Sequence, residues 1–406
     1  MAKINIFHLE IAISGNTNGV ERCIRTLMDV SLFTSDVDVT WIRFTHNIVN
    51  RVYKQRIDNY NIIYFPISNE LKELWGNNRE KALFYNDVLA LIKENTNTSH
   101  VGIVHLHTMN LIQLGIYIRE NMGFKIVSTI HCIPWKSLYN NNVVLFNKLY
   151  ERYYAGSTHK KEFLCDEYES MTYAESDSLV CVTNCGKEFI TTINKQHTSK
   201  IVVIPNGLRD TKVKRNANTD VISCVFVGDA NPSKGLNYLL ECINMSQYTY
   251  NICLHVVGNY TKSELRGYHK KYPFNDMQFY GSLKWNKLIK IYEKCDIGLI
   301  ASLHEQCSYV AIEMMMSGIP VISSNVDGLD EMFQHEYNAL LFSANYTSKI
   351  GLHFDVKEIY NLLSYLITNQ ELRFKLSKNA RETYLRKYTD IKMINSYICL
   401  YKTLVN

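Results

Sequence analysis

Short runs of residues that are apolar on both faces alternate along this chain with segments of helical periodicity. Strands are expected at 3–9, 39–44, 61–65, 102–106, 125–129 and 179–182, and after residues 204–207 the pattern restarts with strands at 221–227, 251–257, 277–279, 297–301 and 320–323. A strand that is apolar on both faces needs a covering layer on each side, and intervening helices provide the crossovers that parallel strands require. The sequence therefore predicts an α/β fold with two consecutive doubly wound, Rossmann-like domains.

The 406 residues are enough for two or three domains, and the turn Pro205-Asn206-Gly207 marks the expected hinge. We place the first domain at 1–204 and the second at 205–385. The last stretch is helical without a strand pattern, and its final helix, 386–406, is expected to cross back to the first domain. The two domains are expected to face each other across a cleft, because open α/β sheets bind ligands at the carboxyl ends of their strands.

Composition narrows the classes of function. The net charge of +5 suits an anionic ligand or an anionic membrane surface, but it is too small to indicate nucleic acid. No apolar run reaches the roughly 20 residues that span a bilayer, and the opening run lacks the flanks of a signal peptide. The 11 cysteines are scattered without a CxxC pair, which predicts free thiols in a reducing cytoplasm rather than a metal site.

Two glycine-containing loops that join a strand to a helix are candidates for binding phosphate. In 14–22, backbone N–H groups and the helix dipole can meet an anion, although the GxGxxG spacing is absent and an ordinary surface turn is the alternative. In 228–235, Lys234 stands at a helix start, where it can meet a diphosphate as a point charge. There the alternative is a turn capped by Ser233, and Asp229 would repel a phosphate.

The most informative segment is 302–322, which contains two glutamates spaced as Glu305-x7-Glu313. On one continuous helix they would lie about 80° apart, so we place Glu305 in a loop after a strand and Glu313 in the following helix. The N–H groups of Cys307 and Ser308 would then point at an anion near the helix start. Two solvated glutamates are the alternative, which the apolar sequence around Glu313 disfavours.

The ordered set of motifs resembles the retaining glycosyltransferases of family four, in the GT-B class. The segments that carry the resemblance are 18–22 (Asn-Gly-Val-Glu-Arg), 204–207 (Ile-Pro-Asn-Gly), 227–228 with 234–235, and Glu305-x7-Glu313 with 317–322 (Ser-Gly-Ile-Pro-Val-Ile). They follow the family's order over nearly the whole chain. Residues 8–21 and 305–309 also show a fainter similarity to glycosyltransferases encoded beside peptide-modification systems in Bacteroidales.

The resemblance implies that the donor is a nucleotide-diphosphate sugar, held by the second domain. The implied contacts are the backbone N–H of Gly19 at the phosphate or sugar, Gly281 at the base, Glu313 at the ribose hydroxyls, and the amides near Cys307 and Ser308 at the phosphate. Two departures leave the diphosphate contacts open. The family usually has Arg, the better bidentate phosphate partner, where Asp229 stands, and it usually has Phe-Gly in place of Cys307-Ser308.

The resemblance also implies catalytic roles for Lys234, Glu305 and His131. Lys234 would neutralise the diphosphate leaving group, and Glu305 would touch the sugar hydroxyls and the cationic face of the transition state. His131 would lie near the sugar. These residue types suit the chemistry, because glycosyl transfer passes through an oxocarbenium-like state that a nearby carboxylate stabilises. In the family the phosphate itself assists deprotonation of the acceptor, so no protein nucleophile is required.

The acceptor side is less distinct. His105 and His107 fall on one face of a strand at its carboxyl end, and we expect His107, together with Glu21, to line the acceptor site, although a structural role is the common one for such histidines. A basic and aromatic stretch at 148–161 suits either a membrane interface or a solvated helix rim. The DxD at 36–38 matches a metal-binding signature of another glycosyltransferase class, but it stands before a strand and is interpreted as a solvated strand entry.

The expected function is therefore that of a bacterial hexosyltransferase (EC 2.4) in polysaccharide or glycoconjugate biosynthesis. It would move a sugar, with retention, from a UDP- or GDP-type donor to a glycan, lipid-linked, peptide or protein acceptor. We expect no metal, no cofactor and no nucleic-acid partner, and a cytoplasmic location that includes the inner face of the membrane if the acceptor is lipid-linked. Two alternatives remain open: a nucleotide-sugar 2-epimerase of the same fold, and a non-catalytic sugar-nucleotide-binding partner of another transferase.

Overall fold

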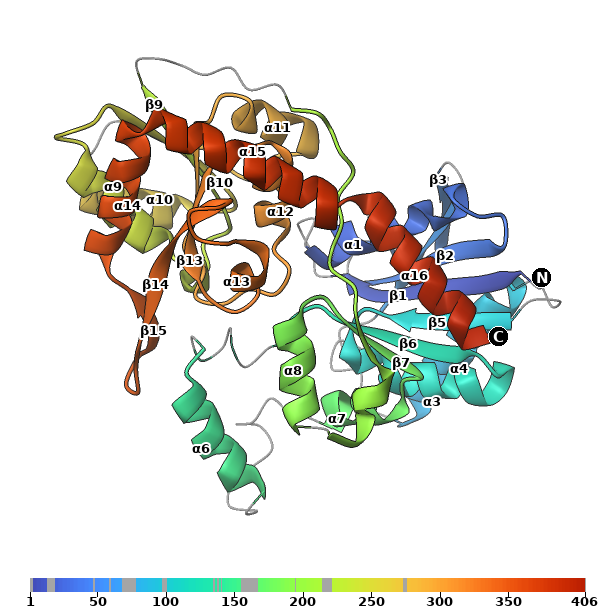
Figure 1. Cartoon of the computed structure of the whole chain (residues 1–406). Coiled ribbons are helices and arrows are strands. Elements are labelled where there is room, and N and C mark those ends of the chain that lie inside the picture. Colours follow the sequence, from blue (N-terminus) through green and yellow to red (C-terminus); the bar gives the residue numbers. More distant parts are fainter. Residues whose placement is uncertain are drawn as a thin grey trace. The chain divides into compact units, whose positions relative to one another are not determined.

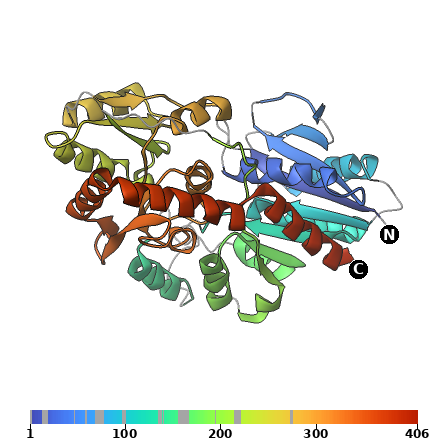
Figure 2. The ribbon, with the colours of Figure 1, turned by 45° about the horizontal axis from the view of Figure 1, so that its top comes forward.

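The computed structural model describes residues 3–12, 19–46, 48–57, 60–67, 78–96, 101–133, 136, 139, 141–154, 167–193, 195–213, 221–272 and 276–405. These residues form two compact units, each built on a sheet of its own (Figures 1 and 2). The first unit comprises Met1–His131, Cys165–Gly207 and Asp390–Asn406, and the second comprises Cys132–Leu164 and Leu208–Thr389. The predicted fold class, two doubly wound α/β domains, is confirmed.

The sheet of the first unit has eight strands in the order β3-β4-β2-β1-β5-β6-β7-β8. All neighbours run parallel except β3, which pairs antiparallel with β4. The strands are β1 (Ile4–Ala12), β2 (Val37–Thr45), β3 (Tyr53–Ile57), β4 (Tyr60–Pro66), β5 (Val101–Leu106), β6 (Lys125–Ile130), β7 (Ser178–Cys181) and β8 (Ile201–Val203). Six of them match the expected runs. β3 and β8 carry no such signal, because β3 is a mostly exposed edge strand and β8 has three residues.

Helices cover both faces of this sheet (Figure 1). They are α1 (Gly19–Met28), α3 (Asn78–Glu94), α4 (Ile112–Met122), α7 (Glu167–Glu175), α8 (Asn184–Ile193) and α16 (Asp390–Val405), with 3-10 turns at Asp29–Leu32, Met109–Leu111 and Lys195–Lys200. In α1 the buried residues recur at helical spacing, as Cys23, Ile24 and Leu27 show. α4 approaches β5 closely because Gly115 lacks a side chain, and a Cβ there would already crowd Leu106.

The sheet of the second unit has seven strands in the order β11-β10-β9-β12-β13-β14-β15, all parallel except β15. The strands are β9 (Ile222–Val227), β10 (Ile252–Val257), β11 (Met277–Phe279), β12 (Ile297–Ile300), β13 (Val321–Asn325), β14 (Ala339–Thr347) and β15 (Gly351–Phe354). The helices are α6 (Val143–Tyr154), α9 (Leu236–Ser246), α10 (Lys262–Lys271), α11 (Trp285–Tyr292), α12 (Tyr309–Met316), α13 (Leu329–Met332), α14 (Val356–Thr368) and α15 (Gln370–Lys387), with a 3-10 turn at Pro232–Lys234. Five strands match the expected runs. The hairpin of β14 and β15 carries no strand signal, because its far end is largely exposed and polar.

Both sheets reverse their strand order beside their first strand. β1 lies between β2 and β5 in the first sheet, and β9 lies between β10 and β12 in the second. In open α/β sheets, ligands bind outside the carboxyl ends of the strands at such a switch point. The loops that follow β1, β5, β9 and β12 are therefore the places where the fold favours a site.

The two C-terminal helices belong to different units. α15 packs against α12 in the second unit, whereas α16 lies against α1 in the first (Figure 1). Tyr397 and Tyr401 of α16 are fully buried, and Lys402 forms an ion pair of 3.2 Å with Asp36. The expected return of the last helix to the first domain is confirmed, with its start at Asp390. Among the helices of the described residues, none combines the length and the apolar character needed to cross a membrane.

Candidate active site

Lys234 and Glu305 lie side by side at the switch point of the second sheet. Lys234 is in the loop after β9, and Glu305 is in the loop after β12. The Nζ of Lys234 donates to Oε1 of Glu305 over 2.5 Å, and the same oxygen accepts the hydroxyl of Ser302 at 2.9 Å. The backbone N–H of Leu303 donates to the carbonyl of Ser233 at 2.7 Å, which joins the two loops. The structure therefore brings together two residues that the sequence places 71 positions apart.

Local hydrogen bonds and one glycine shape the loop that carries Lys234. The side chain of Asn231 accepts the backbone N–H of Ser233 at 3.0 Å and its hydroxyl at 2.9 Å, which caps the short 3-10 turn. Gly235 ends the turn with φ of 72°, a left-handed conformation that favours glycine. A Cβ on Gly235 would overlap the backbone carbonyl of Ala301, at the start of the loop that carries Glu305. Glycine at this position therefore allows the close approach of the two loops.

The charges around Glu305 keep it ionised. Burial by itself raises the pKa of Glu305, but the charge of Lys234 and its hydrogen bond outweigh burial and hold that pKa below its ordinary value. The neighbouring His304 has its pKa lowered to about 4, chiefly by burial, although the charge of Glu305 opposes the shift. At neutral pH the Glu305 loop therefore presents a carboxylate and a neutral imidazole, and the carboxylate pairs with Lys234 of the neighbouring loop.

Lys136 is a second cation beside this loop. Its side chain is buried, forms an ion pair with Asp327, and lowers the pKa of His304 through its charge. Asp327 precedes Gly328, where a Cβ would overlap the carbonyl oxygens of residues 305 and 306, so the ion pair is anchored on the Glu305 loop. Lys136 stands in no motif or periodic pattern, and only the folded chain reveals its position.

Glu313 lies in α12, in the helix after the Glu305 loop, as the spacing predicts, and its side chain is fully buried. The hydroxyl of Tyr292, on α11, donates to Oε2 of Glu313 at 2.6 Å. Cys307 and Ser308 precede α12 and are also buried, with the hydroxyl oxygen of Ser308 accepting the N–H of Ala311 at 3.4 Å. A carboxylate has about four acceptor positions, and Tyr292 occupies one of them, so contact between Glu313 and a ribose stays a prediction.

Gly281 and Asp229 are both joined to the loop that follows β10. The carbonyl of Gly281 accepts the N–H of Gly258 at 3.1 Å. Gly281 itself has a φ of 67°, and a Cβ added to it would meet no atom within 4 Å. The carboxylate of Asp229 accepts the N–H of Asn259 at 2.7 Å. An arginine in place of Asp229 could not accept that bond, so this departure from the family pattern has a structural use. The roles of Gly281 at a base and of the Cys307–Ser308 amides at a phosphate stay predictions.

In the first unit, His107 and His131 lie just beyond the carboxyl ends of β5 and β6. Nδ1 of His107 lies 2.9 Å from Nε2 of His131, and Nε2 of His107 lies 2.9 Å from Nδ1 of His8, on β1. His107 and His131, which the sequence predicts on the acceptor and sugar sides, are thus in direct contact. His8 is a further member that has a sequence signal, because His8 and Glu10 interrupt the apolar run of β1.

His105 has a different environment on the same face of β5. Its ring lies 4.2 Å from the ring of His107, between centroids, which confirms the expected shared face. Both of its nitrogens lie 2.7 Å from hydroxyl oxygens, those of Tyr401 and Thr129. His105 therefore ties the C-terminal helix to the sheet and leaves His107 as the histidine that points toward His131.

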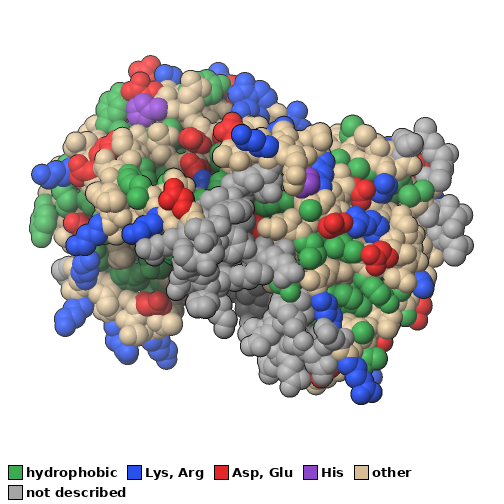
Figure 3. Space-filling model, turned by 90° about the horizontal axis from the view of Figure 1, so that it is seen from below, with side chains coloured by type: hydrophobic (Ala, Val, Ile, Leu, Met, Phe, Trp, Pro, Cys, Tyr) green, Lys and Arg blue, Asp and Glu red, His purple; other side chains and the backbone are tan. Residues whose placement is uncertain are grey.

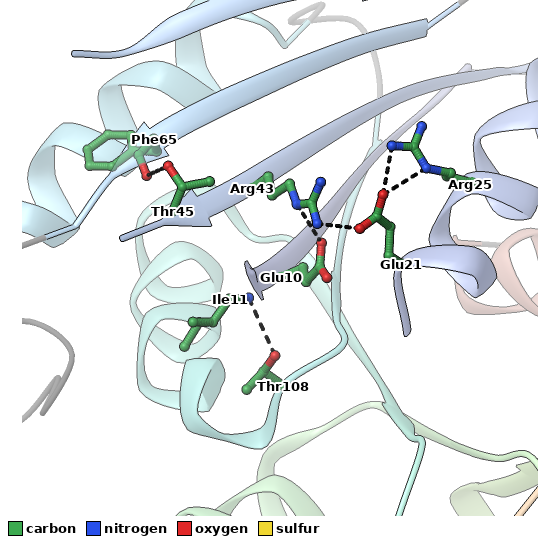
Figure 4. A network of polar contacts seen from close by, with 8 residues as sticks. All are labelled: Glu10, Ile11, Glu21, Arg25, Arg43, Thr45, Phe65 and Thr108. Atoms are coloured by element: carbon green, nitrogen blue, oxygen red, sulfur yellow. Dashed lines mark hydrogen bonds and ion pairs between the residues drawn. The ribbon is translucent and has the colours of Figure 1, made fainter. Parts of the chain in front are cut away.

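Glu21, which we expect on the acceptor side, lies in a network of charged side chains on α1 and the first sheet (Figure 4). Its two carboxylate oxygens accept hydrogen bonds from Arg25 at 2.7 Å and from Arg43 at 2.5 Å. Arg43 also lies 3.4 Å from the carboxylate of Glu10, and both arginines lie over the ring of Trp41. These contacts hold α1 against β2, and a role for Glu21 toward an acceptor stays a prediction.

Because Glu10 is buried in this network, we predict that its titration makes the free energy of unfolding depend on pH. Burial raises the pKa of Glu10 to about 7, although the charge of Arg43 opposes the shift. A raised carboxyl pKa means that the folded protein holds a proton that the unfolded chain has lost, so this stabilisation is complete below the unfolded pKa, about 4.3, and is lost as the pH rises through 7. Glu10→Gln has no carboxyl group to titrate, so it should not lose this stabilisation. We expect its unfolding free energy, relative to that of the wild type, to be about 3 kcal/mol higher at pH 8 than at pH 4. Urea unfolding of both proteins across this range measures the difference.

The exposed Glu94, on α3, provides the control, because Glu94→Gln changes a carboxylate that is 66% exposed and pairs with the exposed Lys54. It should leave the pH dependence unchanged. Parallel pH profiles for the wild type and Glu10→Gln would contradict the assignment.

The remaining predicted residues lie at the margins of the described structure. Gly19 is the first residue of α1, and residues 14–18 before it lie outside the described residues. The basic and aromatic stretch 148–161 begins on α6, and its part from 155 onward also lies outside them. Asp36, the first residue of the DxD, pairs with Lys402 of α16. On the face shown in Figure 3, basic side chains are interspersed with acidic and apolar ones.

Two family models match the chain over adjoining segments. Residues 17–212 match Glycosyltransferase Family 4, and residues 209–383 match Glycosyl transferases group 1. An uncharacterized glycosyltransferase of Methanocaldococcus jannaschii is 23% identical over 58% of this chain and 62% of its own length, so the chain spans about three fifths of that relative. The UDP-Gal:alpha-D-GlcNAc-diphosphoundecaprenol alpha-1,3-galactosyltransferase of Escherichia coli is 23% identical over 75% of this chain and 76% of its own.

Solved structures show the same fold. The sucrose-phosphate synthase of Thermosynechococcus elongatus superposes with a TM-score of 0.73 at 17% identity and covers 99% of both chains. HepE of Anabaena, solved in complex with UDP and glucose, has a TM-score of 0.69 at 13% identity and covers 98% of this chain and 99% of its own. At these identities the likeness establishes the GT-B arrangement of two Rossmann-like domains.

Proposed function

The chain belongs to the retaining glycosyltransferases of family four and group 1, which use nucleotide sugars, and we propose that it moves a hexose from a UDP- or GDP-type donor without a metal ion. The proposed acceptor is a glycan, a lipid-linked sugar, or a peptide or protein. In this proposal the second domain, 205–385, holds the donor, and the first domain, 1–204 with the last helix, selects the acceptor.

The observation that carries this proposal is the pair of opposite charges on Lys234 and Glu305 at the carboxyl ends of β9 and β12. Cleavage of the bond between sugar and diphosphate creates negative charge on the leaving oxygen and positive charge on the sugar ring. A fixed ammonium group beside a fixed carboxylate has the polarity that stabilises both charges as they separate. Lys234 is assigned to the diphosphate and Glu305 to the ring.

Geometry supports this assignment in a second way. The oxygen of Glu305 that accepts from Lys234 is also held by Ser302, and the backbone bond from Leu303 to Ser233 fixes the two loops. Groups that are already in place need little reorganisation when charge develops, and such preorganised groups contribute most to catalysis. Lys136, which is paired with Asp327, also acts on the Glu305 loop, because its charge lowers the pKa of His304.

The relatives supply the donor and acceptor classes of the proposal. The name of the Escherichia coli relative states a UDP-linked sugar and a lipid diphosphate acceptor, and HepE is solved with UDP and glucose. We extend the UDP-type donor to this chain on that basis. A lipid-linked acceptor would also place the protein at the inner face of the membrane, as we expect from the sequence for that class of acceptor.

Two observations favour a second candidate function, a chain that binds a sugar nucleotide for another transferase without turnover. Asp229 stands where the family usually has a phosphate-binding arginine, and Glu313 is buried against Tyr292. Both features weaken donor contacts that the family uses. Turnover separates the two candidates, because only an enzyme releases the nucleotide diphosphate from the sugar.

The test is a thermal-shift screen of the wild type with UDP-, GDP-, ADP- and dTDP-sugars, followed by an assay for release of the nucleotide. A donor that binds only the folded state stabilises it by about 2.7 kcal/mol at 100 times its dissociation constant, so we expect one nucleotide class to raise the melting temperature by several degrees. Nucleotide release should continue in EDTA. A shift without release supports the binding partner, and release that stops in EDTA contradicts the metal-independent mechanism.

A further inference from the structure

Three imidazoles, two of them buried (His8 and His107) and one partly buried (His131), form a continuous chain of hydrogen bonds that ends at His131. The links are His8 Nδ1 to His107 Nε2 and His107 Nδ1 to His131 Nε2, each 2.9 Å long. We infer that this chain sets the tautomer of His131, so that it presents an N–H donor at Nδ1 toward the substrate rather than a lone pair. The inference rests on the proposed function only for the identity of the substrate; the tautomer itself is a property of the free protein.

The distances indicate hydrogen bonds and not a metal site. Two groups have ligating atoms within 4.8 Å of one another, the spacing at which a cation could be considered: His8, His105 and His107, and Cys23, His107 and His131. However, two nitrogens on one tetrahedral zinc ion lie about 3.3 Å apart, because each Zn–N bond is about 2.05 Å long. Both nitrogens of His105 are already directed to hydroxyl oxygens, those of Tyr401 and Thr129. Separations of 2.9 Å fit a proton shared between each pair of rings.

All members of the chain are neutral near pH 7. Burial is the largest cause in each case, and it lowers the pKa of His8 to about 3, that of His131 to about 4, and that of His107 well below its ordinary value. A neutral imidazole has one N–H and one bare nitrogen. His107, in the middle, must therefore donate through one nitrogen and accept through the other, and each outer ring takes the complementary role at its linked nitrogen. The tautomer of one ring thus determines the tautomers of all three.

His8, the ring farthest from His131, determines the direction in which the hydrogen bonds of the three rings are donated. Nε2 of His8 is buried and has no hydrogen-bond partner among the described residues. Its nearest aromatic neighbour, His105, meets it ring to ring at 4.9 Å between centroids. A buried N–H without an acceptor is rarer in proteins than an acceptor without a donor. The bare nitrogen of His8 is therefore Nε2, and its proton is on Nδ1.

The proton position on His8 then determines those on His107 and His131. Nδ1–H of His8 donates to Nε2 of His107, and Nδ1–H of His107 donates to Nε2 of His131. The one proton of neutral His131 is left on Nδ1. In this state His131 can donate to an oxygen of a sugar or a phosphate, but it cannot remove a proton from the acceptor through that nitrogen. His8 and His107 are positioning residues, and His131 is the residue that would touch the substrate.

The direct test is NMR of the free, full-length protein labelled with ¹⁵N at histidine. We expect a proton on Nδ1 of His8, His107 and His131, whereas an unconstrained neutral imidazole carries it mostly on Nε2. Scalar couplings across the hydrogen bonds should join His8 Nδ1 to His107 Nε2 and His107 Nδ1 to His131 Nε2. His105, whose partners are hydroxyls, should show no such coupling. The exposed His269, whose ring lies edge-on to Phe279, provides the solvent-exposed reference. A proton on Nε2 of His131, or missing couplings, overturns the inference.

Two nearly isosteric variants test the consequence for transfer. His131→Asn can place an N–H donor near the position of Nδ1, whereas His131→Asp offers an ionised acceptor. We expect the asparagine variant to keep at least about tenfold more transfer activity than the aspartate variant. Equal activities, or a more active aspartate variant, overturn the role as donor. The NMR result does not depend on catalysis, so a failure of the proposed function is distinguishable from a failure of this inference.

Discussion

Lys234→Ala is expected to lower the rate of sugar transfer by about 10²–10³-fold, the range seen when one preorganised charge-stabilising group is removed from an active site. The lysine lies 2.5 Å from Glu305 in the loop after β9, where the leaving diphosphate is expected. Without the ammonium group, the negative charge on the leaving oxygen develops unopposed. Glu305→Gln should have an effect of similar size, because it removes the charge that faces the sugar ring and preserves the shape of the side chain. The measurement is the rate of nucleotide release with the donor that the thermal-shift screen identifies.

Lys290→Ala is the matched control, because Lys290 is an exposed lysine of the same unit that pairs with Glu293 within one turn. It should retain the wild-type rate. Removing Lys234 also leaves the carboxylate of Glu305 without its ionic partner in a partly buried place, so the melting temperature of each variant should be measured beside its rate. Transfer within twofold of wild type in a folded Lys234→Ala would contradict the assignment of Lys234 to the leaving group.

Gly235→Ala is expected to cost more than about 3 kcal/mol of stability in the second unit and to abolish donor binding. The residue combines a positive φ of 72° with a close approach to the backbone of Ala301. A methyl group there would overlap a carbonyl oxygen, which cannot rotate away as a side chain can. The loops that carry Lys234 and Glu305 would therefore separate. Hydrogen exchange of the amides in β9 and β12 reports the local loss of stability.

Gly281→Ala distinguishes the cost of backbone strain at a positive φ from the cost of a methyl group that overlaps another atom. Gly281 has nearly the same φ, 67°, but a methyl group there would meet no atom within 4 Å. It should cost about 1–2 kcal/mol, which is the strain of a left-handed conformation alone. Gly123→Ala, with φ of 69° and equally open surroundings at the end of α4, repeats this comparison in the first unit. Equal losses for Gly235→Ala and Gly281→Ala would show that the approach of the two loops does not matter.

The alternating pattern of the sequence predicts most of the fold because it reports burial. Strands such as β9 and β12 are largely apolar and are buried on both faces, so their runs are continuous and easy to recognise. β3, β8 and the β14–β15 hairpin carry weak signals. An edge strand has one row of free backbone groups and fewer buried side chains, and its composition approaches that of a loop.

The positions of the motifs along the sequence also predict where the site of Lys234 and Glu305 lies in the second unit. A loop that follows a strand in a doubly wound sheet always opens at the same edge, so the positions of Lys234 and Glu305 after two strands predict that they lie near one another. Their ion pair, its support from Ser302 and the closeness imposed by Gly235 depend on atomic contacts between loops. Lys136 and Tyr292 could not be anticipated at all, because no spacing relates them to the residues they serve.

The two α/β domains, the return of the last helix, the family and the set of polar residues at the strand ends can all be read from the chain before it folds. They follow from periodicity and local order, which are properties of neighbouring residues. Which of those residues touch is visible only after folding: Lys234 neutralises Glu305, Asp229 holds a neighbouring loop, and His8 reaches His131 through His107. Such contacts join residues 24–99 positions apart in the first unit and 30–71 positions apart in the second. Their geometry depends on how strands are ordered in a sheet rather than on how residues follow one another.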